Sequence, residues 1–208
     1  MTRADIPEAL LERRLIAIVR GGDADRLDAV CDTLIANGVD YLEITTNTTG
    51  WEKSVARLAD HGTVGVGTVL TVGDVQRAAD AGASYIVSPH TDPALGDVAR
   101  RVGLAWFPGA LTPTEILTAW RAGATAVKVF PARSAGGPGY LRDVLAPLDF
   151  IPVIPTGGIS ADDIPAYLAA GAIAVGVGSP LMGDAGRGGS LDALGERARE
   201  MAAGARRG

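Results

Sequence analysis

The sequence predicts a parallel (β/α)8 barrel, the TIM-barrel fold, and two regularities support this. Eight short apolar runs begin roughly 20 to 26 residues apart, about one βα unit each. The segments between them open with helix-capping residues and close with glycine. An open doubly wound sheet is the alternative, but the turn after the first run, at residues 20–23, lacks the Gly-x-Gly-x-x-Gly pattern.

The predicted strands lie at residues 15–19, 41–45, 64–67, 85–88, 105–108, 126–130, 152–155 and 174–177. Helix-start patterns occur at residues 71–74, 112–115 and 160–163. Residues 5–14 predict an extra N-terminal helix that covers the bottom of the barrel. Residues 183–189 are glycine-rich and predict a mobile loop before a last helix at 191–205. We therefore expect residues 1–208 to form a single barrel domain.

Composition narrows the possible partners. The chain has 208 residues, 47% of them hydrophobic, and a net charge of -5, which fits a compact protein and indicates no nucleic-acid partner. No apolar run approaches the roughly 18 residues that a membrane span needs, and no secretory signal pattern is present. We therefore expect a cytoplasmic protein with no membrane partner.

Cysteine and histidine are scarce. The lone Cys31 excludes an internal disulfide, and its helical surroundings predict a buried structural thiol. The two histidines, His61 and His90, do not suffice for a His-rich site, so we expect no metal. We expect His90 to be a pocket-wall or surface residue.

Lys128 stands inside the apolar run at residues 126–130, and the only other lysine is Lys53. An ammonium is costly to bury, so a buried Lys128 needs a paired carboxylate, a solvated pocket or a neutral state. A neutral amine in a pocket can attack a ketone and form a Schiff base. The alternative is a strand-end lysine whose amine reaches solvent, and this segment alone leaves both interpretations open.

Two further charged residues lie near the carboxyl ends of predicted strands. Glu43 belongs to the second strand, and the carboxyl ends of barrel strands meet at one mouth, so Glu43 and Lys128 are expected to face each other. Glu43 either neutralises Lys128 as a buried ion pair or moves protons on a substrate held there, and the two roles are compatible. Arg20, after the first strand, either binds a carboxylate in bidentate fashion or is an exposed strand-end arginine.

Glycine turns follow the seventh and eighth predicted strands: Thr156, Gly157 and Gly158 in the first, Gly178 and Ser179 in the second. Such turns let backbone N–H groups approach an anion, and a following helix N-terminus adds a favourable dipole. These two loops hold phosphate in many barrels of this fold. We expect a phosphate site here, with ordinary tight turns as the alternative.

In this order and spacing, these segments resemble the 2-keto-3-deoxy-6-phosphogluconate and 4-hydroxy-2-oxoglutarate aldolase family, from about residue 15 to residue 182. The resemblance rests on residues 17–20 (AIVR), 42–45 (LEIT), 65–69 (GVGTV), 87–90 (VSPH), 108–109 (PG), 112–115 (TPTE), 127–131 (VKVFP), 155–158 (PTGG) and 176–179 (GVGS). It implies a Schiff-base aldolase on a (β/α)8 barrel that uses no metal or cofactor and assembles as a homotrimer.

The same resemblance implies roles for the site residues. Lys128 would form the carbinolamine and then the iminium with a phosphorylated keto acid, and Glu43 would move the protons. The iminium is an electron sink that makes carbon–carbon cleavage accessible, giving pyruvate and glyceraldehyde 3-phosphate. The expected substrate-binding residues are Arg20, Thr68, Pro89 and Phe130. The expected phosphate-binding residues are Thr156, Gly157, Gly158, Gly178 and Ser179.

Two features point to different branches of the family. Some 6-phosphogluconate enzymes carry an arginine where this chain has Asn47, and residues 47–52 (NTTGWE) resemble the 6-phosphogalactonate branch. Thr156 resembles the 6-phosphogluconate branch, because the galactonate branch tends to be apolar there. The 6-phosphogluconate type is the favoured substrate, with 6-phosphogalactonate and unphosphorylated 4-hydroxy-2-oxoglutarate as alternatives.

Other functions also fit a phosphate-binding barrel. A thiazole-phosphate or indole-phosphate enzyme would use Lys128 as a charge clamp rather than a nucleophile. A ligand-binding or regulatory relic of the barrel would bind sugar phosphates without turnover.

Overall fold

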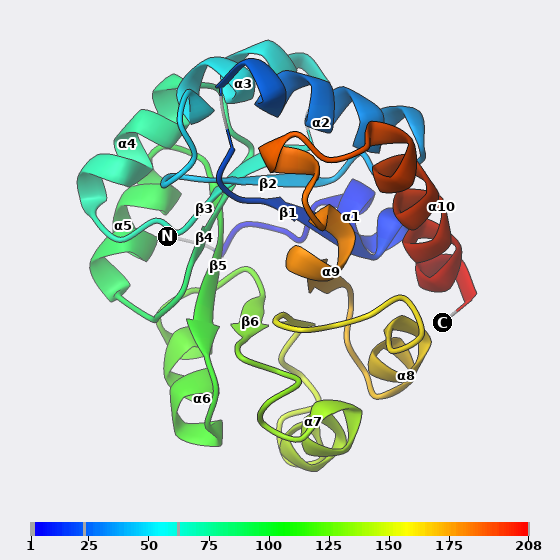
Figure 1. Ribbon diagram of the computed structural model, residues 1–208. Coiled ribbons are helices and arrows are strands. Elements are labelled where there is room, and N and C mark those ends of the chain that lie inside the picture. The colour runs from blue at the N-terminus through cyan, green and yellow to red at the C-terminus, as the bar shows by residue number, and fades with distance from the viewer. Residues whose placement is uncertain (1–2, 23, 62, 208) are drawn as a thin grey trace.

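Eight parallel strands form a sheet in the order β7-β6-β5-β4-β3-β2-β1-β8, surrounded by helices (Figure 1). This computed structural model describes residues 3–22, 24–61 and 63–207. The strands are β1 (Leu15–Val19), β2 (Leu42–Thr45), β3 (Val64–Gly67), β4 (Tyr85–Ser88), β5 (Ala105–Ala110), β6 (Val127–Val129), β7 (Val153–Pro155) and β8 (Val175–Val177). The helices are α1 (Glu8–Arg13), α2 (Ala24–Ala36), α3 (Trp51–Leu58), α4 (Val72–Asp80), α5 (Pro93–Arg101), α6 (Pro113–Arg121), α7 (Gly137–Leu145), α8 (Ile164–Ala169), α9 (Ser179–Met182) and α10 (Leu191–Arg207), with 3-10 turns η1 (Ala59–His61) and η2 (Ala185–Arg187).

The two ends of the sheet meet and close it into a barrel. β1 pairs with β8, and Thr156, just after β7, bridges to Gly176 of β8. The N–H of Ile173 donates to the Val153 carbonyl at 3.1 Å along the same seam. The predicted (β/α)8 barrel is therefore confirmed, with all eight strands within two residues of their predicted bounds, and the doubly wound alternative is wrong.

Large side chains fill the interior of the barrel towards its bottom. The rings of Tyr41 and Tyr85 stack with their centroids 4.9 Å apart, and Phe107 lies 5.2 Å from Tyr85. Leu10 of α1 is fully buried in this same cluster, so the N-terminal helix covers the barrel bottom as predicted. The helix is shorter than expected because Pro7, its N-cap, has an extended ψ of 129°.

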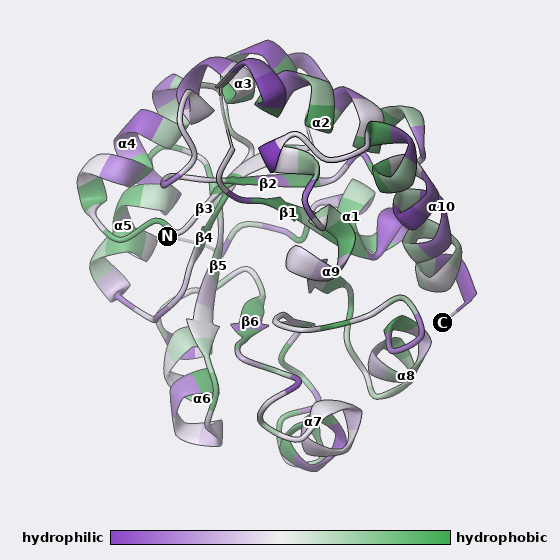
Figure 2. Ribbon diagram, viewed as in Figure 1, coloured by the Kyte–Doolittle hydropathy of each residue, from purple (hydrophilic) through white to green (hydrophobic). Residues whose placement is uncertain are grey.

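A second apolar layer lies between the strands and the surrounding helices. Hydrophobic residues follow the strands, whereas the outer surfaces of helices such as α3 and α10 are hydrophilic (Figure 2). Helix α10 packs beside α2 and α8. Cys31 is buried in this layer, and desolvation raises the pKa of its thiol to about 12, which confirms the structural thiol. None of the helices within the described residues is long and apolar enough to cross a membrane.

Two of the three predicted helix starts are confirmed. Thr71 and Thr112 cap α4 and α6, and each capping box is complete. Helix α8 begins only at Ile164, because the N–H and hydroxyl of Ser160 both donate to the Asp163 carboxylate in a turn before it.

The segment predicted as a mobile loop, residues 183–189, contains the 3-10 turn η2 and has fixed contacts. Arg26 donates from Nε to the Ala185 carbonyl at 2.9 Å and from Nη2 to the Gly189 carbonyl. Next to this segment, Arg197 of α10 donates to the Leu181 carbonyl of α9 at 2.7 Å. The sequence-based prediction missed this turn because its contacts come from helices far away in the chain.

Candidate active site

Lys128 and Glu43 meet inside the mouth of the barrel from opposite strands. Lys128 is the central residue of β6 and Glu43 lies in β2, and Lys128 Nζ is 3.9 Å from Glu43 Oε1. Their side chains are only 7% and 3% exposed. The predicted facing of the two residues is confirmed, and the alternative in which the lysine amine reaches solvent is wrong.

The Glu43 carboxylate is electrostatically costly in this position. Oε1 is buried without a hydrogen-bond partner among the described residues. Desolvation raises the pKa of Glu43, opposed by the positive charges of Lys128 and Arg20. A carboxyl group with a raised pKa keeps its proton to a higher pH than a solvated one, which suits a proton donor and acceptor.

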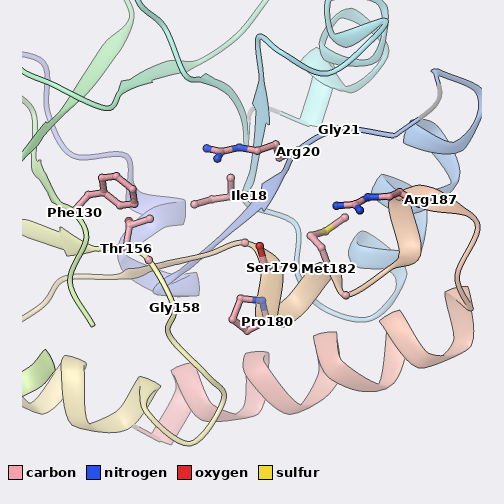
Figure 3. Close-up of a pocket in the computed structure, with 14 residues that line it drawn as sticks. Ile18, Arg20, Gly21, Phe130, Thr156, Gly158, Ser179, Pro180, Met182 and Arg187 are labelled. Atoms are coloured by element: carbon pink, nitrogen blue, oxygen red, sulfur yellow. The ribbon is translucent and has the colours of Figure 1, made fainter. Parts of the chain in front are cut away.

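A cavity of about 650 Å³ opens at the carboxyl ends of β1, β6, β7 and β8 (Figure 3). Both predicted phosphate turns line it, together with Arg20 and Phe130. Thr156 lines this cavity and also a small internal space that borders Glu43 and Lys128. Lys128 and Glu43 do not line the cavity themselves, and the Thr156 side chain lies between it and the small space beside the amine.

The first of the two predicted phosphate turns is fixed by its own glycines and by hydrogen bonds from a neighbouring segment. Gly157 and Gly158 have φ of 105° and 74°, a left-handed backbone that favours glycine. The N–H of Ala132 donates to the Thr156 carbonyl at 2.8 Å, and Arg133 Nη1 donates to the Gly158 carbonyl at 3.0 Å. The main chain is thereby fixed where an anion can approach it.

The expected contribution of a helix dipole after the seventh strand is wrong. Helix α8 begins at Ile164, well beyond Gly158, because Ser160 to Asp163 form a separate turn. After β8, helix α9 follows Gly178 directly but contains only four residues. Any anion held here must depend on main-chain N–H groups, hydroxyls and arginines.

Of the other predicted substrate-binding residues, Phe130 lines this cavity, whereas Pro89 and Thr68 do not. Phe130 is 41% exposed, and its ring centroid lies 5.5 Å from Lys128 Nζ. It also lines a second depression of about 380 Å³ that contains Pro89 and His90. Thr68 lines neither space, although its φ of 58° marks an unusual backbone at the end of β3.

Asn47, which replaces the family arginine, lies outside the cavity. Its Oδ1 accepts a hydrogen bond of 2.7 Å from the Thr45 hydroxyl. In the same turn Thr48 Oγ1 accepts the Gly21 N–H at 2.9 Å. Asn47 therefore belongs to a network that ties the end of β2 to the residue after Arg20.

Sequence reasoning missed one charged residue of the cavity, Arg187 on η2. The available signal was its position: a basic residue in a glycine-rich loop after the eighth strand, at the end of the barrel where functional loops gather. No group of three or more His, Cys, Asp or Glu side chains that could hold a metal ion occurs in the part of the chain that the structure describes.

Comparison with known proteins identifies the family. The family model described as "KDPG and KHG aldolase" matches residues 6–193. A probable 2-dehydro-3-deoxy-6-phosphogalactonate aldolase of Rhizobium meliloti (strain 1021) is 38% identical over 182 residues, covering 85% of each chain. A 2-dehydro-3-deoxy-phosphogluconate aldolase of Pseudomonas aeruginosa is 35% identical, covering 76% of this chain and 73% of the relative. A solved structure described as native KDPGal superposes with a TM-score of 0.85 at 32% identity, covering 99% and 98% of the two chains.

The barrel, the buried lysine–glutamate pair and these matches agree. The chain belongs to the KDPG and KHG aldolase family, whose members are lyases that perform aldol cleavage.

Proposed function

We propose that this lyase cleaves a 2-keto-3-deoxy-6-phospho sugar acid to pyruvate and glyceraldehyde 3-phosphate through a Schiff base on Lys128. The observation that carries the proposal is the approach of Lys128 Nζ to 3.9 Å from the buried Glu43 carboxylate, in a small space that shares Thr156 with a cavity lined by two glycine turns. An amine, a proton carrier and an anion site are the three parts that this chemistry needs.

The proposed sequence of steps assigns one task to each residue. The Lys128 amine attacks the C2 carbonyl, and Glu43 protonates the hydroxyl that leaves as water, which gives the iminium. Glu43, now a carboxylate, removes the C4 hydroxyl proton. The C3–C4 bond breaks, and its electron pair moves into the iminium to form an enamine. Protonation of the enamine at C3 and hydrolysis then release pyruvate and restore the amine.

The C4 epimer depends on residues that touch the substrate. Of the two conflicting branch signatures, Thr156 lines the cavity, whereas Trp51 is buried outside it and Glu52 pairs with Arg77 on the surface. This favours the 6-phosphogluconate type. The second candidate is the 6-phosphogalactonate type, supported by the name of the Rhizobium relative.

Cleavage assays on both epimers test the proposal, with the two lysines as a matched pair of variants. Pyruvate release is expected from at least one epimer with the wild type and with Lys53→Ala, since Lys53 is exposed on α3. Lys128→Ala is expected to release none. Cleavage by Lys128→Ala at the wild-type rate would refute the assignment of the nucleophile.

The resemblance also implies a homotrimer, and we include this in the proposal. Large hydrophobic side chains remain exposed on the protomer at Leu11, Leu70, Val72, Phe130 and Phe150. Light scattering should give about three times the 21.2 kDa chain mass, and a monomer mass at micromolar concentration would contradict it.

A further inference from the structure

The cavity carries positive charge that the glycine turns do not account for. Two arginines, Arg20 and Arg187, line it, and its described lining contains no acidic residue, although the whole chain has a net charge of -5. Figure 3 shows Arg20 beside Ile18 and Arg187 beside Met182. A cation that faces a cavity without a carboxylate is suited to an anionic ligand.

The main chain that carries Arg187 is fixed to the barrel. Arg26 of α2 donates to the carbonyls of Ala185 and Gly189, on both sides of Arg187. The turn also lies against the loop after β1: a Cβ on Gly22 would be 2.4 Å from the Gly186 carbonyl oxygen. Because the backbone is held from both sides, the exposed guanidinium is presented to the cavity at a lower entropic cost than on a free loop.

The two arginines serve different ends of the cavity. Arg20 lies close enough to Glu43 for its charge to oppose the rise in the pKa of that carboxyl, which places it towards the reacting centre. Arg187 is not among the charges that act on Glu43, and Figure 3 shows it beside Met182, away from Thr156 and Phe130. A substrate with one anionic group at each end matches this arrangement.

Resting on the proposed aldolase function, we infer that Arg187 is a specificity-determining residue that binds the phosphate of the substrate. It selects phosphorylated keto acids over unphosphorylated ones of the same carbon skeleton. Arg20 binds the carboxylate at the other end of the substrate. The glycine turns donate main-chain N–H groups to the phosphate from the side opposite Arg187.

The test compares kcat/KM for a 2-keto-3-deoxy-6-phosphohexonate with that for the unphosphorylated 2-keto-3-deoxyhexonate. In Arg187→Gln the ratio of the two values should fall by about 10- to 100-fold, mainly through a higher KM for the phosphorylated substrate, since one charge-assisted hydrogen bond is lost. Arg187→Lys keeps the charge and should restore part of the ratio. Arg121→Gln is the matched control. It removes an exposed arginine at the C-terminal end of α6 that does not line the cavity, and it should keep the wild-type ratio.

Inorganic phosphate provides an independent probe. It should inhibit the wild type competitively, and its inhibition constant should rise by about 10-fold or more in Arg187→Gln. An unchanged ratio with unchanged phosphate inhibition in Arg187→Gln overturns the inference, as does an equal loss in Arg121→Gln.

A separate experiment distinguishes an error in the proposed aldolase function from an error in the role of Arg187. Reduction of the wild-type protein with borohydride in the presence of pyruvate does not involve a phosphate. If the wild type traps no pyruvate, the Schiff-base aldolase assignment fails. If it traps pyruvate while Arg187→Gln keeps its preference for phosphorylated substrate, only the role of Arg187 fails.

Discussion

The carboxylate of Glu43 occupies the space that a side chain at Gly67 would need. A Cβ on Gly67 would lie 2.0 Å from Glu43 Oε1 and 2.6 Å from Cγ. Across the β2–β3 pair Glu43 aligns with Gly65, and Gly67, which aligns with Thr45, is its diagonal neighbour. The glycine therefore makes room for the Glu43 carboxylate in the narrow interior of the barrel.

Gly67→Ala should inactivate the enzyme without unfolding it. Gly67 does not have a positive φ, so the backbone accepts alanine, and the clash is relieved by rotation of the Glu43 side chain away from Lys128. Turnover is expected to fall by about 10²-fold or more, as for loss of a general acid–base group. The control is Gly73→Ala in α4, where a Cβ meets nothing closer than 3.6 Å. Full activity in Gly67→Ala would show that the position of Glu43 is unimportant.

Glu43→Gln removes the proton carrier while keeping the shape of the side chain. Turnover should fall by about 10²- to 10⁴-fold, the usual contribution of general acid–base catalysis. Steady-state assays measure this against Glu52→Gln, which breaks a surface ion pair with Arg77 and should leave the rate unchanged. A Glu43→Gln enzyme with wild-type turnover would assign proton transfer to another group.

The pH dependence of stability should report the raised pKa of Glu43. The folded protein holds a proton on Glu43 at pH values where the unfolded chain, with the ordinary glutamate pKa of 4.5, has lost it. Folded protein then binds more protons, so the contribution of Glu43 to the free energy of unfolding falls as pH rises through this window. Urea unfolding of wild type and Glu43→Gln should show the wild type losing stability relative to the variant as the pH rises above 4.5, the ordinary pKa of glutamate. A relative gain with rising pH would reverse the sign and contradict the desolvation argument.

Thr156→Val should change the preference between the C4 epimers. The Thr156 hydroxyl lies next to β8, since a Cβ on Gly176 would be 2.5 Å from Thr156 Oγ1. If this hydroxyl contacts the substrate, its loss should change the ratio of kcat/KM for the two epimers by about 10-fold or more. Thr156→Ser retains the hydroxyl and should keep the wild-type ratio. Equal ratios in all three proteins would remove Thr156 from substrate selection.

The strands and the Lys128–Glu43 pair could be predicted because they follow from local rules. Apolar runs at regular spacing identify barrel strands, and a charged residue in the middle of such a run, as at Lys128, is unusual enough to mark a site. The glycine turns at Gly157 and Gly178 were found in the same way, by their place after a strand.

The parts that could not be predicted depend on contacts between distant segments. Arg187 reaches the cavity only because Arg26, far away in the sequence, holds the η2 turn. The start of α8 at Ile164 was missed because the Ser160–Asp163 hydrogen bonds compete with the helix. The steric role of Gly67 is visible only once β2 and β3 are placed side by side.

The central claim, a Schiff base on Lys128, is tested most directly by reduction with borohydride in the presence of pyruvate, followed by peptide mass mapping. The chain has only two lysines, so the adduct must fall on one of two peptides. We predict a reduced pyruvyl adduct on Lys128, retained in Lys53→Ala and lost in Lys128→Ala. No adduct, or an adduct on Lys53 alone, would contradict it.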